Sequence, residues 1–244
     1  MIVHSAGRTD IGLVRTRNED EWAQIPELHF YALADGMGGH KAGDVAAKRA
    51  VATAIDYARA HAGKESGKLL IAKALDAANR EVYRLAKGDP NLKGMGTTLC
   101  LLRIEGERAY FGHVGDSRIY RMRGGELLQL TEDHSLVSQL IRAGQLRPEE
   151  EQARAYRHVV TRAVGTRSKV LPTLGEIEVA KGDLFLLCSD GLSDQLSGKE
   201  IAGVLRGVAG VAEGAERLIE AATVAGGDDN TTVIVVSIGE ENLP

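Results

Sequence analysis

Aspartate residues beside glycine or at the ends of apolar segments are the side chains of this sequence best suited to chemistry. They are Asp35, Asp116, Asp190 and Asp229, with Asp20 just before a further possible strand. A single aspartate at a strand end is usually a turn residue. Several junctions of the same kind indicate instead that strand ends converge in one layered core. Converging carboxylates repel one another unless cations or protons neutralise them.

The run Asp35-Gly36-Met37-Gly38-Gly39-His40 follows an apolar strand expected over 30–34. No Gly-Lys-Ser/Thr follows, which excludes a phosphate-binding P-loop. The carboxylate of Asp35 and the exposed carbonyl of Gly36 are hard oxygen ligands. With no His-rich or Cys-rich set and no calcium-loop spacing elsewhere, they favour Mg²⁺ or Mn²⁺.

Two such ions ~3.5–4 Å apart can generate a hydroxide and clamp a transferring phosphoryl group. Arg15, five residues before Asp20, could hold two phosphate oxygens through its planar fork. The residues therefore predict a hard-metal phosphoesterase. A calcium-stabilised structural domain stays open as an alternative, and so does a plain solvated loop for the polar cluster 15–20.

The spacing of apolar residues predicts an α+β domain in which strands and helices are segregated in blocks. Helices are expected over 42–61, 67–87, 135–143, 197–206 and 211–225. Strands are expected over 97–104, 108–115, 117–123, 126–130, 174–179, 183–188 and 231–238. Short connections at 105–107 and 124–125 predict hairpins, and we expect the four strands of 97–130 to form an antiparallel meander. Residues 131–170 are irregular and predict either a mobile flap or a plain surface helical pair.

Composition is typical of a globular protein, with 43% hydrophobic and 26% charged residues. The net charge of −4 argues against nucleic acid or an anionic membrane as the main partner. No signal peptide or membrane-spanning run is expected, and Cys100 and Cys188 lie in apolar runs that predict buried free thiols. We therefore expect a cytoplasmic protein.

Several segments together resemble the bacterial type 2C (PPM) metal-dependent Ser/Thr protein phosphatases. They are GLVRTRNED, ALADGMGGHKAGDVAA, MGTTL, HVGDSRIYR, LTEDHSLV, RAVG, LLCSDGLSD and GGDDNTTVIVV, in family order. The resemblance implies a four-layer α-β-β-α sandwich, in which helix pairs flank two antiparallel sheets with metals at one end. It also implies that 1–244 is a single phosphatase domain with a flap subdomain at about 131–170.

The resemblance also assigns roles to individual residues. Asp35 would bridge two metals, the Gly36 carbonyl would bind one of them, and Asp190 and Asp229 would complete the other site. Asp116 with Asp190 would form a third metal site, and Asp20 would accept from metal-bound waters. Arg15 would hold the substrate phosphate.

The proton donor is the least defined of these roles. His40 occupies the histidine position of the bacterial motif and is nominated as acid or as orienter of a water; capping of the following helix is its alternative. His113 and His134 are expected to be structural. Asp228 adds a second carboxylate before Asp229, and the Asp-Asn spacing favours Asp229 as the ligand.

The function implied is hydrolysis of phosphoserine and phosphothreonine in proteins by a metal-bridging hydroxide, opposing a bacterial Ser/Thr kinase, with two or three Mn²⁺ or Mg²⁺ ions. The expected partners are phosphoproteins, and the expected state is a monomer. A catalytically inactive phosphoprotein-binding module on the same fold is the alternative. A dedicated phosphatase for an anti-sigma-factor partner or a secretion-system kinase pathway would have the same chemistry.

Overall fold

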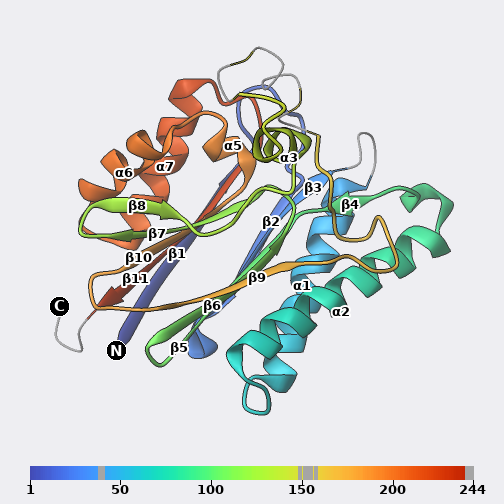
Figure 1. Ribbon diagram of the computed structural model, residues 1–244, viewed down its shortest axis with the longest axis horizontal. Helices are drawn as coiled ribbons and strands as arrows, with labels where there is room; N and C mark the ends of the chain where they lie inside the picture. Colours follow the sequence, from blue (N-terminus) through green and yellow to red (C-terminus); the bar gives the residue numbers. More distant parts are fainter. Residues whose placement is uncertain (38–41, 148–149, 151–155, 157–158, 240–244) are drawn as a thin grey trace.

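The computed structural model describes residues 1–37, 42–147, 150, 156 and 159–239, and contains two antiparallel β-sheets packed face to face between helices (Figure 1). The first sheet has the order β1 (Ile2–Asp10), β11 (Thr231–Gly239), β10 (Leu184–Cys188), β7 (Arg118–Arg123) and β8 (Glu126–Gln129). The second has the order β2 (Asp20–Ile25), β3 (Phe30–Met37), β5 (Leu99–Glu105), β6 (Arg108–Val114) and β9 (Thr173–Glu178), with β4 (Gly96–Thr97) paired to β3.

The helices of the described residues lie mostly outside the two sheets. They are α1 (Gly43–His61), α2 (Gly67–Gly88), α3 (Leu136–Arg142), α5 (Asp190–Ser193), α6 (Gly198–Arg206) and α7 (Val211–Ala225), with 3₁₀ turns η1 (Pro26–Leu28) and η2 (Pro90–Leu92). Helices α1 and α2 cover the second sheet, and α6 and α7 cover the first (Figure 1). The four-layer α-β-β-α sandwich predicted from the sequence is confirmed.

Three apolar layers hold the sandwich together, one under each helix pair and one between the sheets. Strand β3 contributes to two of them because successive side chains of a strand point to opposite faces. Phe30, Ala32 and Ala34 face α1 and α2, whereas Tyr31 and Leu33 face the other sheet. Its apolar run is therefore continuous, as expected for a strand buried on both faces.

The predicted helices at 42–61, 67–87, 135–143, 197–206 and 211–225 are confirmed to within two residues. Helix α6 begins with a capping box, in which the Ser197 hydroxyl accepts from the Glu200 amide and the Glu200 carboxylate accepts from the Ser197 amide. Cys100 and Cys188 are buried free thiols, as predicted. No helix in the described ranges is both long enough and apolar enough to cross a membrane.

The predicted meander over 97–130 is wrong in one respect. The hairpins β5–β6 and β7–β8 are present, but β6 and β7 do not pair, because they belong to different sheets. The chain passes between the sheets at 115–117. Gly115 has φ +106°, and an added Cβ there would lie 2.6 Å from the Thr98 side chain. This crossing requires glycine, and it places Asp116 at the end of the sandwich.

The end of one strand near these aspartates also differs from that predicted. Strand β3 does not end before Asp35 but continues to Met37, so Asp35 and Gly36 are strand residues. Strand β10 ends at Cys188, as predicted, and Asp190 is the first residue of α5. In the 131–170 segment, α3 is present, Ser135 bridges Val160, and most of the polar run at 147–157 lies outside the described residues.

Candidate active site

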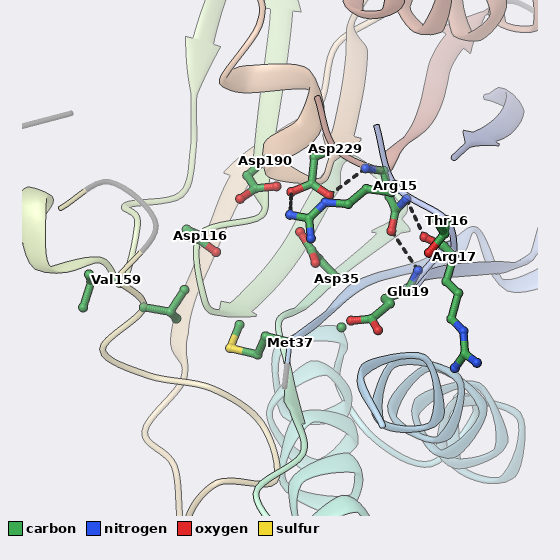
Figure 2. A pocket seen from close by; sticks show the side chains of 13 residues that line it. Arg15, Thr16, Arg17, Glu19, Asp35, Met37, Asp116, Val159, Asp190 and Asp229 are labelled. Carbon is green, nitrogen blue, oxygen red and sulfur yellow. Dashed lines mark hydrogen bonds and ion pairs between the residues drawn. The ribbon is translucent and has the colours of Figure 1, made fainter. Parts of the chain in front are cut away.

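A pocket of about 1060 Å³ opens at the end of the sandwich where β3, α5 and the loops before β2 and β11 meet (Figure 2). Its walls come from segments spread over most of the chain. The lining residues are Arg15, Thr16, Arg17, Glu19, Asp35, Gly36, Met37, Asp116, Val159, Val160, Asp190, Asp229 and Asn230. Asp35, Asp116, Asp190 and Asp229 point toward a common space beside the Arg15 guanidinium (Figure 2).

Asp35 is held in place through its backbone. Its amide donates to Thr98 Oγ1 at 2.8 Å, and its carbonyl accepts from Thr97 Oγ1 at 2.8 Å and from the Thr98 amide at 2.8 Å. The Thr98 hydroxyl lies 2.7 Å from Ser117 Oγ, next to Asp116. Both threonines are fully buried, so the strand carrying Asp35 is fixed by a hydroxyl network with no solvent contact.

Gly36 allows helix α1 to approach this strand closely. An added Cβ would lie 2.3 Å from the Gly43 carbonyl oxygen at the start of α1. The Gly36 amide donates to the Glu19 carbonyl at 3.1 Å. Any larger residue at position 36 would push the helix away from the pocket.

The carboxylates of the pocket raise one another's affinity for protons. Burial raises the pKa of Asp35 well above its usual value, and the charges of Asp190, Asp20 and Asp116 add to the effect. Burial, with the charges of Asp190 and Asp133, raises the pKa of Asp116 to about 7. Several acidic groups thus share a space that is short of positive charge.

Asp20 is not among the residues that line the pocket, but it is directly paired with Asp35 across the β2–β3 ladder. It is 8% exposed. Its Oδ2 accepts from Ser189 Oγ at 2.8 Å, but its buried Oδ1 has no hydrogen-bond partner among the described residues. Burial is the main reason that its pKa rises to about 8. A buried carboxylate oxygen without a partner is costly and indicates a missing donor or ion.

Asp229 and Asp228 have different surroundings although they are adjacent. Asp229 Oδ2 accepts from Arg15 Nη2 at 2.7 Å, and Asp229 lines the pocket. Asp228 is exposed and accepts from Gln195 Nε2 at 3.1 Å. The Asp-Asn spacing therefore selected the residue that faces the other carboxylates.

Asn230 was not singled out as a functional residue by sequence reasoning, yet it joins three parts of the site. Its Oδ1 accepts from the Glu19 amide at 2.8 Å, and its Nδ2 donates to the carbonyls of Ile11 and Arg17 at 2.9 Å each. The side chain thus fastens the loop that carries Arg15 to the start of β11. A polar residue directly after a predicted ligand was the signal available in the sequence.

Glu19 was also missed as a separate site residue. It lines the pocket, and its Oε2 lies beside Gly43 at the N-terminus of α1. Burial and the charge of Asp44 raise its pKa. The positive end of the helix dipole offsets part of the cost of placing this carboxylate there.

The donor set fits divalent cations that prefer oxygen ligands. The partnerless Oδ1 of Asp20 and the raised pKa of Asp35 both indicate that positive charge belongs in this pocket. No three acidic, histidine or cysteine side chains within the described ranges are drawn together tightly enough to ligate an ion alone. Such loosely spaced ligands still suit Mg²⁺ and Mn²⁺, because these ions keep several water ligands; Mg²⁺ in particular dehydrates reluctantly.

Of the three histidines considered from the sequence, the structure describes His113 and His134. His40 lies outside the described residues. His113 Nε2 is 2.9 Å from the Glu132 carbonyl, His134 Nδ1 accepts from the Gly115 amide at 3.1 Å, and the two rings stack at 4.4 Å. The structural role predicted for His113 and His134 is consistent with these contacts. They support the Gly115 crossing and therefore Asp116.

Comparison with known proteins places these features among phosphatases. The family model described as protein phosphatase 2C matches residues 14–222. Protein phosphatase PhpP of Streptococcus pneumoniae is 39% identical over 245 residues, covering 96% of this chain and 97% of that protein. The crystal structure of the Mycobacterium tuberculosis serine/threonine phosphatase PstP/Ppp superposes with a TM-score of 0.91 at 40% identity, covering 98% of this chain and all of that one. A structure of the PstP catalytic domain in complex with two manganese ions has a TM-score of 0.85 at 40% identity, with 98% and 99% coverage.

Proposed function

Because the chain belongs to the protein phosphatase 2C family and is a Ser/Thr protein phosphatase, we propose that it hydrolyses phosphoserine and phosphothreonine in proteins with Mn²⁺ or Mg²⁺ bound in the carboxylate pocket. One observation carries the proposal. Carboxylates from distant segments converge beside the exposed guanidinium of Arg15 (Figure 2). The related structure of the PstP catalytic domain contains two manganese ions.

The carboxylates and one carbonyl are assigned to the ions. Asp35 and the Gly36 carbonyl, with Asp190 and Asp229, would hold two of them, and Asp116 with Asp190 a third. Asp20 would accept hydrogen bonds from the water around them through its partnerless Oδ1. When bound, such ions supply Lewis-acid chemistry: they activate water as a nucleophile and neutralise charge on a phosphoryl group.

Arg15 is assigned to the substrate phosphate. Its side chain is 56% exposed, and among the described residues Asp229 is its side-chain partner, through Nη2. The hydrogen bond to Asp229 raises the pKa of Arg15, and the negative charges of Asp229, Asp190 and Asp35 add to the effect, so the guanidinium stays charged. A planar fork that is always charged can hold two oxygens of a phosphate at once.

The leaving serine or threonine oxygen must receive a proton. We assign this step to His40, acting directly or through a water that it orients. Residues 35–37 lead into 38–41, so His40 follows Asp35 closely along the chain. The assignment rests on this sequence position and on the chemistry of histidine.

We also propose that 1–244 act as one catalytic domain, as a cytoplasmic monomer, with 131–170 as a flap over the pocket and with a bacterial Ser/Thr kinase as the opposing enzyme. Val159 and Val160, from the proposed flap, line the pocket. The inactive binding module is disfavoured, since a protein without catalysis has no need to retain every acidic group of the site. Asp35, Asp116, Asp190 and Asp229 are all present.

The proposal predicts metal-dependent turnover of a phosphothreonine peptide that depends on Asp35. With Mn²⁺ the wild-type protein should release phosphate, and a chelator should abolish the release. Asp35→Asn should lower kcat/KM by more than about 100-fold, because loss of a residue that only supports a metal ligand already costs 10–100-fold. The matched control is Asp228→Asn, an exposed aspartate next to the site, which should behave as wild type. Full activity of Asp35→Asn would refute the assignment.

A further inference from the structure

The loop that carries Arg15 is unusually well fastened for an exposed segment. The Leu13 amide donates to the Gly227 carbonyl at 2.7 Å, and the Gly12 amide donates to Asp10 Oδ1 at 2.8 Å. Asn230 Nδ2 donates to the carbonyls of Ile11 and Arg17. The conformation of the loop is therefore set by both the first and the last strand of one sheet.

This fixed loop directs aliphatic side chains outward. Leu13 is 70% exposed, Val14 is 64% exposed and Ile11 is 39% exposed. Single exposed aliphatic residues are ordinary. Three within four positions of a hydrogen-bonded loop are different, because apolar surface on a rigid support loses little conformational entropy when a ligand covers it.

The position of these side chains, next to Arg15, indicates which ligand would contact them. Leu13 and Val14 directly precede Arg15, and the Cα atoms of Leu13 and Arg15 are at most about 7 Å apart. None of these three aliphatic side chains lines the pocket itself, but a substrate whose phosphate reaches Arg15 has neighbouring residues within reach of this surface. Val159, 44% exposed, lies across the pocket from Arg15 and is also apolar (Figure 2).

We propose that Ile11, Leu13 and Val14 form an apolar ledge that docks an aliphatic side chain of the phosphoprotein within about three residues of its phosphorylated serine or threonine. This inference rests on the proposed function, since Arg15 must hold the phosphate. Arg15 binds the phosphate of the substrate, and the adjacent ledge contacts an aliphatic side chain near the phosphorylated residue. The substrates are then phosphorylated segments with leucine, isoleucine or valine near the phosphate.

The test compares phosphothreonine peptides in which leucine replaces serine at single positions within three residues of the phosphothreonine. For wild type, kcat/KM should rise about 10-fold for leucine at one or more positions, because covering one aliphatic side chain gives part of its full burial free energy. In Leu13→Ser/Val14→Ser that preference should fall to near unity. Both residues are exposed, so the variant should fold as wild type does.

The matched control is Leu69→Ser, at a leucine that is 44% exposed near the start of α2. Helix α1 runs from the pocket over 19 residues, roughly 28 Å, before the chain turns into α2. The control should keep the leucine preference. A wild type without any preference, or a double variant that retains it, would overturn the ledge.

Two further measurements separate the possible failures. If p-nitrophenyl phosphate is not hydrolysed with Mn²⁺, the proposed function itself fails; if it is hydrolysed but no leucine preference appears, only the ledge fails. Sedimentation tests the remaining occupant, a second copy of this chain. A monomeric wild type supports the ledge as a substrate surface, whereas a dimer that the double variant abolishes would assign the surface to self-association and overturn the proposal.

Discussion

The ion pair between Arg15 and Asp229 joins two parts of the site that are far apart in the sequence. Arg15 Nη2 donates to Asp229 Oδ2 at 2.7 Å, joining the loop between β1 and β2 to the segment just before the last strand. Both side chains are partly exposed, at 56% and 33%, so this ion pair adds little to stability. We interpret it as positioning: the guanidinium is kept beside the carboxylates where a phosphate would arrive.

Arg15→Lys should separate charge from geometry. Lysine keeps the positive charge but cannot hold two phosphate oxygens with a planar fork. We predict that KM for a phosphothreonine peptide rises about 10-fold while kcat changes less. The control is Arg17→Lys, because the Arg17 side chain points away from the carboxylates (Figure 2). Steady-state kinetics measure both, and an unchanged KM for Arg15→Lys would remove this residue from phosphate binding.

At this scale the sequence predicted much of the pocket. Asp35, Asp116, Asp190, Asp229 and Arg15 all line it. A single aspartate at the end of an apolar segment would have been read as a turn residue, but several junctions of the same kind made these aspartates identifiable. Glu19 and Asn230 were not, since their importance comes from contacts with residues far away in the sequence, which no local pattern contains.

At the scale of elements, the site depends on how loops are tied to strand ends. Glycine at positions 36 and 191 allows close packing: added Cβ atoms would lie 2.3 Å from the Gly43 carbonyl and 2.1 Å from the Asn230 carbonyl. Asn230 then joins the 11–19 loop to β11. The site is built where such close approaches bring β3, α5 and β11 together.

Asn230→Ala should weaken both the fold and phosphate binding. It leaves the Glu19 amide and the carbonyls of Ile11 and Arg17 without their partner, and we predict a loss of about 2–4 kcal/mol in the free energy of unfolding. Loosening the loop should also raise KM for the phosphopeptide, through Arg15.

Denaturant unfolding and steady-state kinetics check the two effects separately. Asn91→Ala is the control, because Asn91 is on the surface and its amide groups donate to nearby Asp89. If Asn230→Ala lost stability but kept its KM, the side chain would have a structural role alone.

The end of β3 and the connection after β6 differ from what the local sequence pattern predicts. The strand expected over 30–34 stops before Asp35, but pairing with β2 and β4 keeps residues 35–37 in the strand. The short 115–117 connection predicted a meander, but it carries the chain from one sheet to the other. In both cases tertiary pairing overrides a local signal that is correct for an isolated segment.

At the scale of the whole molecule, the sandwich concentrates acidic groups at one end. The two sheets bring segments from residue 15 to residue 229 to one pocket. Apolar patterns predicted an α+β domain, because burial of apolar faces dictates packed layers, and the family resemblance implied the four-layer order. Which strand lies beside which could not be read from these patterns, since β1 pairs with β11 across almost the full length of the chain.

This concentration of charge predicts an unusual pH dependence of folding stability when a chelator keeps the protein free of metal. Burial raises the pKa of Asp20 to about 8 and that of Asp116 to about 7, whereas unfolded aspartate titrates near about 3.9. Between these values the folded state binds more protons than the unfolded state, so stability falls as pH rises. The pKa values of His113 and His134 are lowered by burial and act in the opposite direction, but only below about pH 6.5.

In the presence of chelator, Tm should therefore be higher at about pH 6.5 than at about pH 8.5. Saturating Mg²⁺ should remove or reverse the difference, because the ions replace the protons. Asp116→Asn should flatten the dependence, whereas Asp228→Asn should not. Calorimetric scans at the two pH values test this, and a chelated protein that became more stable with rising pH would contradict the electrostatics described.

The measurement that tests the central claim most directly is anomalous diffraction from crystals soaked in Mn²⁺. The claim is that acidic side chains from distant segments share bound cations in one pocket. We predict manganese peaks within about 2.0–2.3 Å of oxygens from Asp35, Asp190 and Asp229, with Arg15 nearby. A fully soaked crystal with no manganese among these three residues would contradict the account.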